Sequence, residues 1–266
     1  MAGYADDLAL AHTLADSADA IAMARFRSLD LKVEAKPDLT PVSDADTAVE
    51  RAIRATLARA RPRDSVLGEE FGRSEAAAGP GSRHWVIDPI DGTKNYVRGV
   101  PIWATLIALM EGDTPVVGLV SAPALGRRWW AGRGLGAFAG RHQHAATRIE
   151  VSSVRRLADA SFCYASLNGW QDNGRLPQML DILLGTWRSR AYGDFYGYML
   201  LAEGALDAMV EPELSLWDMA ALIPIITEAG GKVTDLDGRT CADKSSVIAT
   251  NGLLHESVLT ALTPRG

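Results

Sequence analysis

The segment DPIDGT at residues 88–93, directly after the apolar run WVI at residues 85–87, constrains the structure of this chain more than any other segment. It places two carboxylates three residues apart at the end of a predicted strand. Proline fixes φ and glycine permits a tight turn, so Asp88 and Asp91 can point at one spot while the next two amides face an oxyanion. Such a turn suits a hard cation beside a phosphate ester, and an ordinary Asx turn is the alternative.

Two further acidic segments favour a cation site over an ordinary Asx turn. GEEF at residues 68–71 follows a short apolar run and reads as a strand that ends in carboxylates. WDMA at residues 217–220 opens a helical pattern that continues to Ala229, with the glycine pair at 230–231 as its C-cap. Asp218 therefore falls in the first turn of a predicted helix.

Glu69, Asp88, Asp91 and Asp218 together form a set of four carboxylates without cysteine or histidine. Oxygen ligands of this kind favour Mg²⁺ over zinc or copper. Four like charges repel one another unless cations lie between them, so the set itself predicts metal ions. Phosphate-ester hydrolysis is a slow uncatalysed reaction that metal ions accelerate, because they neutralise charge and lower the pKa of a bound water.

In these three motifs and in their order, the chain resembles the inositol monophosphatase superfamily of Mg²⁺-dependent phosphatases. The resemblance implies the layered α-β-α-β-α sandwich of the inositol monophosphatase and fructose-1,6-bisphosphatase type, an α+β and α/β architecture. Residues 1–150 form the predicted N-terminal half, which carries most metal ligands. Residues 151–266, where strand and helix patterns alternate, form the α/β half of the same compact catalytic unit.

The resemblance also assigns roles to individual residues. It implies that two or three Mg²⁺ ions are held by Glu69, Asp88, Asp91, Asp218, Asp44 and the carbonyl of Ile90. Thr93, with Glu69, would orient a metal-activated water for direct attack, and the amides of Gly92 and Thr93 would hold the phosphate. The alternative for Asp44 is structural, because it opens a predicted helix whose dipole stabilises a carboxylate.

Substrate specificity is expected from the segment RAYGDF at residues 190–195, where inositol phosphatases usually carry small residues. Asp194 and Glu211 would form an acidic pocket for a cationic substrate, and Arg190 is assigned to the same substrate site. The alternative for Asp194 is a helix N-cap ahead of Phe195. This segment resembles the histidinol-phosphate phosphatase branch of the superfamily, whose substrate carries an amine and an imidazole.

The predicted activity is therefore Mg²⁺-dependent hydrolysis of L-histidinol phosphate, a small-molecule phosphate ester. Three alternatives stay open: an inositol-1-phosphate phosphatase of broad specificity, a nucleotide phosphatase, and a non-catalytic regulatory protein of the same fold. A nucleotide phosphatase should need basic or aromatic residues for the base, and the sequence offers no clear set. A regulatory protein would not need every ligand position to be intact.

Charge and composition restrict the partners. A net charge of −6, with no basic run among aromatic residues, argues against nucleic acid. No apolar run approaches membrane-spanning length, and the N-terminus is acidic where a signal peptide would be basic. With only Cys163 and Cys241, the sequence has no disulfide framework, so we expect a cytoplasmic protein. The resemblance also implies that the protein is a homodimer, because members of the superfamily commonly form one.

Apolar spacing predicts helices from about Asp6 to Arg27 and from Asp44 to Ala60. Residues 128–138 predict a hairpin, and its GxGxxA match is not read as a dinucleotide site because no helix follows. The Trp129-Trp130 pair within it is expected either to pack inside the hairpin or to form a dimer surface.

Overall fold

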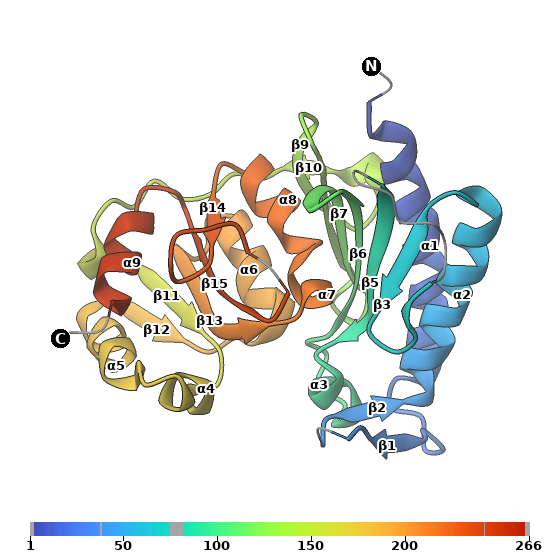
Figure 1. Cartoon of the computed structure of the whole chain (residues 1–266), viewed down its shortest axis with the longest axis horizontal. Coiled ribbons are helices and arrows are strands. Elements are labelled where there is room, and N and C mark those ends of the chain that lie inside the picture. The colour runs from blue at the N-terminus through green and yellow to red at the C-terminus, as the bar shows by residue number, and fades with distance from the viewer. Residues whose placement is uncertain (1–2, 38, 75–81, 242, 264–266) are drawn as a thin grey trace.

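The computed structural model describes residues 3–37, 39–74, 82–241 and 243–263. Figure 1 shows two β-sheets side by side, with one helical layer between them and another on each outer face. This arrangement confirms the predicted α-β-α-β-α sandwich. No helix among the described residues is long and apolar enough to cross a lipid bilayer.

The helices of the three layers are named in the order of Figure 1, from the larger sheet to the smaller. The outer layer on the larger sheet consists of α1 (Ala5–Arg25) and α2 (Asp44–Ala60). The layer between the sheets consists of α6 (Asp194–Ala202) and α8 (Leu222–Glu228). The layer on the smaller sheet consists of α4 (Leu167–Asp172), α5 (Leu176–Gly185) and α9 (His255–Leu262). The short helices are α3 (Thr93–Val97) and α7 (Leu216–Met219).

The larger sheet has the strand order β10-β9-β8-β7-β6-β5-β3-β4. Neighbouring strands are antiparallel except β3 and β5, which run parallel. Its strands are β3 (Ser65–Gly68), β4 (Gly72–Arg73), β5 (Arg83–Asp91), β6 (Ala104–Glu111), β7 (Thr114–Ala122), β8 (Arg127–Gly132), β9 (Gly136–Gly140) and β10 (Thr147–Arg148).

The smaller sheet has the order β12-β11-β13-β15-β14. Strand β11 is parallel to both of its neighbours, and β15 is antiparallel to both of its own. Its strands are β11 (Ser161–Tyr164), β12 (Arg188–Arg190), β13 (Ala208–Leu214), β14 (Lys232–Thr234) and β15 (Ser245–Thr250). A separate antiparallel hairpin consists of β1 (Val33–Ala35) and β2 (Pro41–Ser43).

Helix α2 has the predicted bounds, and α1 differs from the prediction by one residue at its start and two at its end. The stripe of Val49, Ile53 and Leu57 on α2 is buried against the larger sheet and α1, as the spacing predicts. Ser43 begins α2 with a capping box, in which its side chain and that of Asp46 pair with the backbone of the first turn.

The predicted hairpin is confirmed as β8 and β9, joined through Gly134 and Leu135. Trp129 and Trp130 are 1% and 4% exposed, so both indole rings pack in the core and neither forms a surface. Because side chains alternate along a strand, the two tryptophans lie on opposite faces of β8. Their rings therefore enter different apolar clusters on the two sides of the sheet.

The helix expected after Trp217 is two helices, α7 and α8, and the prediction of one continuous helix is wrong. Pro224 explains the break, because its ring crowds the carbonyl of Ala220 and it has no N–H to donate there. The predicted C-cap is confirmed: the amides of Gly231 and Gly230 donate to Ile226 and Thr227 in a Schellman pattern.

Candidate active site

A bulge near the end of β5 brings Asp88 and Asp91 to the same side of the strand. The pairing register with β6 shifts between these two residues, and Thr105 donates its hydroxyl hydrogen to the Pro89 carbonyl at 2.8 Å inside the bulge. Gly92 follows in the left-handed region at φ 81°, which turns the chain into α3. On a regular strand, side chains three residues apart point to opposite faces. The bulge interrupts this alternation, so the two carboxylates point to the same side.

Asp218 reaches the same place from the second half of the chain. It is the third residue of α7, and its Oδ2 accepts a hydrogen bond from the Ser215 amide at 2.8 Å in a capping box. One carboxylate oxygen from each of Asp88, Asp91 and Asp218 lies within 4.8 Å of the others. The structure therefore brings three of the four predicted carboxylates into one group that could bind a divalent metal.

Glu69 supplies the fourth carboxylate from the turn after β3. Its amide donates to the Ile87 carbonyl at 3.2 Å, so the backbone of Glu69 still follows the sheet. The side chain lines the same cavity, where Lys36 from the β1–β2 hairpin lies 2.6 Å from Glu69 Oε1 and 2.7 Å from Glu70 Oε1. A lysine ammonium thus neutralises part of the acidic site in this structure.

Burial and mutual repulsion raise the pKa values of Asp88, Asp91 and Asp218. Asp88 is 1% exposed and its Oδ1 has no hydrogen-bond partner among the described residues. Burial, and then the charges of Glu69 and Asp91, raise the pKa of Asp88 well above its usual range. Burial is also the main cause that raises the pKa of Asp218 to about 7. A bound cation would reverse these shifts, because it compensates the desolvated charges.

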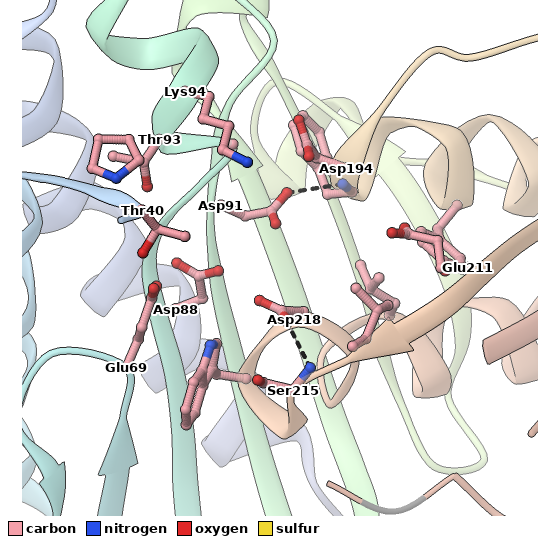
Figure 2. A pocket seen from close by; sticks show the side chains of 17 residues that line it. Thr40, Glu69, Asp88, Asp91, Thr93, Lys94, Asp194, Glu211, Ser215 and Asp218 are labelled. Atoms are coloured by element: carbon pink, nitrogen blue, oxygen red, sulfur yellow. Dashed lines mark hydrogen bonds between the residues drawn. The ribbon is translucent and has the colours of Figure 1, made fainter. Parts of the chain in front are cut away.

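These carboxylates line one end of a cavity of about 310 Å³ that lies between the two sheets (Figure 2). The cavity is lined by Thr40, Pro41, Glu69, Asp88, Asp91, Gly92, Thr93, Lys94, Asp194, Phe195, Tyr198, Glu211, Leu214, Ser215, Trp217, Asp218 and Leu222. Among these lining residues Lys94 is the one cation. The Thr93 hydroxyl donates to the Ile90 carbonyl at 2.9 Å, which places the predicted carbonyl ligand beside Thr93.

Asp194 and Glu211 lie across the cavity from Glu69 (Figure 2). Asp194 has φ 45°, an uncommon value outside glycine, and its Oδ2 accepts a hydrogen bond from Asn95 at 3.1 Å. Burial, followed by the charges of Asp194 and Asp218, raises the pKa of Glu211 to about 8. The predicted pair of acidic residues therefore faces the same space as the carboxylates that could bind a metal.

The alternative of Asp194 as a helix N-cap is wrong. Gly193 is the N-cap of α6, and the helix has no side-chain cap. The amide of Phe195 instead donates to Asp91 Oδ2 at 2.8 Å, so the start of α6 is stabilised by a carboxylate of the cluster. Asp194 is left with its side chain directed at the cavity.

Two of the side chains predicted for the site are not brought to the cavity. Asp44 accepts hydrogen bonds from Arg25 at 3.3 and 2.8 Å at the junction of α1 and α2, which agrees with its structural alternative. Arg190 is exposed on β12 and donates to the neighbouring Ser189 carbonyl at 2.7 Å. Neither is among the residues that line the cavity.

Asp46 contacts the lining residue Thr93 from behind the cavity, and the sequence prediction missed it. It is 0% exposed, its Oδ2 accepts from the Ser43 amide at 2.8 Å, and its Oδ1 lies 3.4 Å from the Thr93 hydroxyl. Burial raises the pKa of Asp46 to about 6, and Glu69 adds to the shift. The signal was the capping pattern Ser43-x-x-Asp46, which turns the third helical residue back toward the preceding chain.

Comparison with known proteins agrees with this geometry. The sequence model of the inositol monophosphatase family matches residues 5–265. The chain belongs to the inositol monophosphatase family. Family membership makes it a phosphoric monoester hydrolase, and the acidic group described above fits the divalent metal that enzymes of this family generally use.

Relatives within the inositol monophosphatase family cover the chain almost completely. The histidinol-phosphatase of Streptomyces coelicolor is 62% identical over 269 residues, which is 100% of both chains. The histidinol-phosphatase of Mycobacterium tuberculosis is 55% identical and spans 97% of this chain and 98% of its own. Among solved structures, an inositol monophosphatase from Zymomonas mobilis has a TM-score of 0.85 at 34% identity and covers 98% of this chain and 99% of its own.

Proposed function

We propose that this enzyme hydrolyses L-histidinol phosphate to L-histidinol and phosphate with the aid of Mg²⁺. The observation that carries the proposal is a single cavity with a metal-binding carboxylate group at one end and the acidic pair Asp194 and Glu211 at the other. A substrate with a phosphate at one end and cationic groups at the other matches both ends. The two histidinol-phosphatases of the comparison above, 62% and 55% identical to the chain, support the same substrate.

The residues present fit Mg²⁺ ions. All candidate ligand atoms are oxygens, from Glu69, Asp88, Asp91, Asp218 and the Ile90 carbonyl, and the buried Oδ1 of Asp88 lacks any described partner. We propose two or three ions, because the cluster carries more negative charge than one divalent ion compensates. Bound Mg²⁺ would neutralise charge on the phosphate and lower the pKa of a water molecule.

The protein residues then have separate tasks in the displacement. Thr93 Oγ and the Glu69 carboxylate orient the attacking water, and Asp46 Oδ1, 3.4 Å from that hydroxyl, holds Thr93 in place. The water oxygen forms the new bond to phosphorus while the bond to the ester oxygen breaks, and the proton that the water gives up balances the proton that the leaving oxygen takes up. We assign the amides of Gly92 and Thr93 to the phosphate oxygens.

At the other end, Asp194 and Glu211 would pair with the ammonium and imidazole of the substrate. Lys94 lies on the Asp194 side of the cavity, where its positive charge partly offsets the burial that raises the pKa of Asp194. Arg190 stays a prediction as a substrate contact, and it would have to reorient from its exposed position to reach the cavity.

The decisive experiment compares phosphate release from L-histidinol phosphate and inositol 1-phosphate by the wild type, Asp91→Asn and Asp194→Asn. Asp91→Asn should abolish release from both esters. Asp194→Asn should lower kcat/KM for L-histidinol phosphate about 10- to 100-fold, the worth of about 1.5–3 kcal/mol for a charged hydrogen bond. The kcat/KM of this variant for inositol 1-phosphate should be nearly unchanged. The matched control is Asp172→Asn, at an exposed position. Equal wild-type turnover of both esters would contradict the proposed substrate.

We also propose that the enzyme is a cytoplasmic homodimer. Leu180, Leu184 and Trp187 are 40%, 86% and 70% exposed beside the edge strand β12, which favours a protein partner on this face. Sedimentation velocity should show a dimer, and Trp187→Glu should convert it to a monomer. A wild-type monomer at all concentrations tested would rule the dimer out, and cell fractionation tests the compartment.

A further inference from the structure

Glu50 is a buried carboxylate on α2 that lies outside the cavity and has no part in the chemistry described above. It is 0% exposed, although a glutamate is rarely buried without a specific reason. Its side chain points to the turn formed by Glu69, Glu70 and Phe71, which joins β3 to β4. The same turn carries the proposed metal ligand Glu69.

The Glu50 carboxylate binds the inner side of this turn through the backbone. Its Oε2 accepts a hydrogen bond from the Glu70 amide at 2.8 Å, and its Oε1 accepts one from the Phe71 amide at 3.2 Å. Arg54, one helical turn further along α2, donates to Oε1 at 2.7 Å and compensates the buried charge. Two consecutive amides next to Glu69 are therefore fixed by one side chain.

Gly68 leaves the space that this contact requires. A Cβ atom at residue 68 would lie 2.1 Å from Glu50 Oε1 and 2.6 Å from Oε2. No side chain fits there while Glu50 holds the turn, so the glycine before Glu69 and the glutamate on α2 depend on each other.

Arg54 holds the outer side of the turn. Its guanidinium also donates to the Gly72 carbonyl, and it lies 6.0 Å from the centroid of the Phe71 ring. Arg51 lies over the same ring at 5.2 Å. The turn is thus fixed to α2 through the three residues that follow Glu69, whereas the Glu69 side chain itself contacts the separate β1–β2 hairpin through Lys36.

From these contacts we infer that Glu50 is a positioning residue that fixes the backbone of Glu69 so that its carboxylate meets the metal ion. The inference rests on the proposed function, in which Glu69 is a ligand. Groups that orient a ligand are commonly worth 10- to 100-fold in metal affinity, and a site tolerates displacements of only about 0.5 Å. Glu50 therefore acts on metal affinity through Glu69 without contacting metal or substrate.

The test is Glu50→Gln, an isosteric change. The amide oxygen can accept from one turn amide, but the NH₂ group faces the other N–H and Arg54. Calorimetric titration of Mg²⁺ into the metal-free protein without substrate should show binding weakened about 10- to 100-fold. The Mg²⁺ concentration for half-maximal activity should rise by a similar factor, while kcat at saturating Mg²⁺ stays within about threefold of wild type.

Asp7→Asn is the matched control. Asp7 is a buried carboxylate on α1 paired with Arg61 at 2.9 Å and Arg83 at 2.8 Å, and it lies outside the cavity. Its loss should lower the melting temperature as Glu50→Gln does and leave Mg²⁺ binding unchanged. Equal Mg²⁺ affinity in Glu50→Gln and Asp7→Asn would overturn the inference, since Glu50 would then be structural only.

Gly68→Ala provides an independent route if Glu50→Gln does not fold. The added methyl group displaces the Glu50 carboxylate but keeps the charges of Glu50 and Arg54. Mg²⁺ binding should therefore weaken again. A folded Gly68→Ala protein with wild-type Mg²⁺ affinity would also overturn the inference. Failure of the proposed metal site looks different, because the wild-type protein itself would then not bind Mg²⁺. Failure of the proposed substrate would show in the comparison of the two esters and would leave Mg²⁺ binding by the wild type intact.

Discussion

At the scale of single residues, burial disfavours the charge of two carboxylates of the cavity, Glu211 and Asp218. Burial raises the pKa of Glu211 to about 8 and that of Asp218 to about 7, with neighbouring carboxylates adding to both shifts. Ordinary values are about 4.3 for Glu and about 3.9 for Asp. In the metal-free protein these groups therefore oppose folding once they ionise.

This predicts a pH dependence of the metal-free protein. Between about pH 4 and about pH 8 the folded state binds more protons than the unfolded state, so the free energy of unfolding should fall as pH rises. Urea unfolding in EDTA at several pH values measures this slope. Glu211→Gln should flatten it above about pH 7, because the neutral side chain has no proton to lose. An unchanged slope in that variant would show that Glu211 does not titrate in this range.

Asp46 and Asp44 form a matched pair for the second prediction. Asp46→Asn should lower kcat by about 10²-fold or more, the usual range for a group that acts on proton transfer, because Thr93 loses the carboxylate beside it. Asp44→Asn loses the contact with Arg25 and should reduce stability by about 1 kcal/mol with kcat nearly unchanged. Steady-state kinetics and urea unfolding measure both effects. The reverse result would restore Asp44 as the ligand expected from the sequence.

At the scale of elements, the position of Asp218 depends on how closely the α7–α8 corner approaches the larger sheet. Gly118 on β7 lies between Ala108 and Ala131 on the neighbouring strands, so a line of small residues crosses the sheet. A Cβ atom at residue 118 would lie 2.1 Å from the Ala221 carbonyl oxygen. The corner that carries Asp218 therefore rests directly on the backbone of β7.

Gly118→Ala should consequently destabilise the protein by about 1–3 kcal/mol, the usual cost of overpacking, and should weaken Mg²⁺ binding by displacing α7. Urea unfolding and Mg²⁺ titration measure the two effects. Gly185→Ala is the control, because no atom lies within 4 Å of a Cβ at that position. Similar stability of both variants would mean that the corner is free to shift.

Elements with a strong local signal could be predicted from the sequence, and those that depend on distant contacts could not. Helix α2 has its capping serine and a regular apolar stripe, and its bounds were found. Strand β15 was missed because its apolar run at residues 247–249 is short and its stability comes from pairing with β13 and β14.

The same distinction between local signals and distant contacts holds for the candidate site. The motifs identified Glu69, Asp88, Asp91 and Asp218 correctly as neighbours, because each follows a recognisable strand end or helix start. Asp46 was missed in favour of Asp44, since both lie in the first turn of α2 and only the packing of that turn against Thr93 distinguishes them. Glu50 has no local signal for its contact with the turn after β3, because the amides that it binds lie about twenty residues away.

At the scale of the whole molecule, the carboxylates come from both sheets and repel one another across the space between them. Mg²⁺ should therefore stabilise the entire fold, by about 2.7 kcal/mol at a concentration one hundred times its Kd. Thermal unfolding should show a higher melting temperature with MgCl₂ than with EDTA. NaCl at equal ionic strength controls for screening, and Asp218→Asn should lose most of the shift. An equal shift in NaCl would show that no specific site is filled.

The end of the cavity that we assign to phosphate comes from β5 and α3, and the other end comes from α6 and β13, which belong to different layers of the sandwich. Substitutions in the second set can change which alcohol fits without disturbing the hydrolytic groups of the first. A fold divided in this way allows selection to explore new leaving groups while the reaction itself is retained. Because the two ends of the cavity come from different layers, the specificity for the alcohol can change while the hydrolytic reaction stays the same.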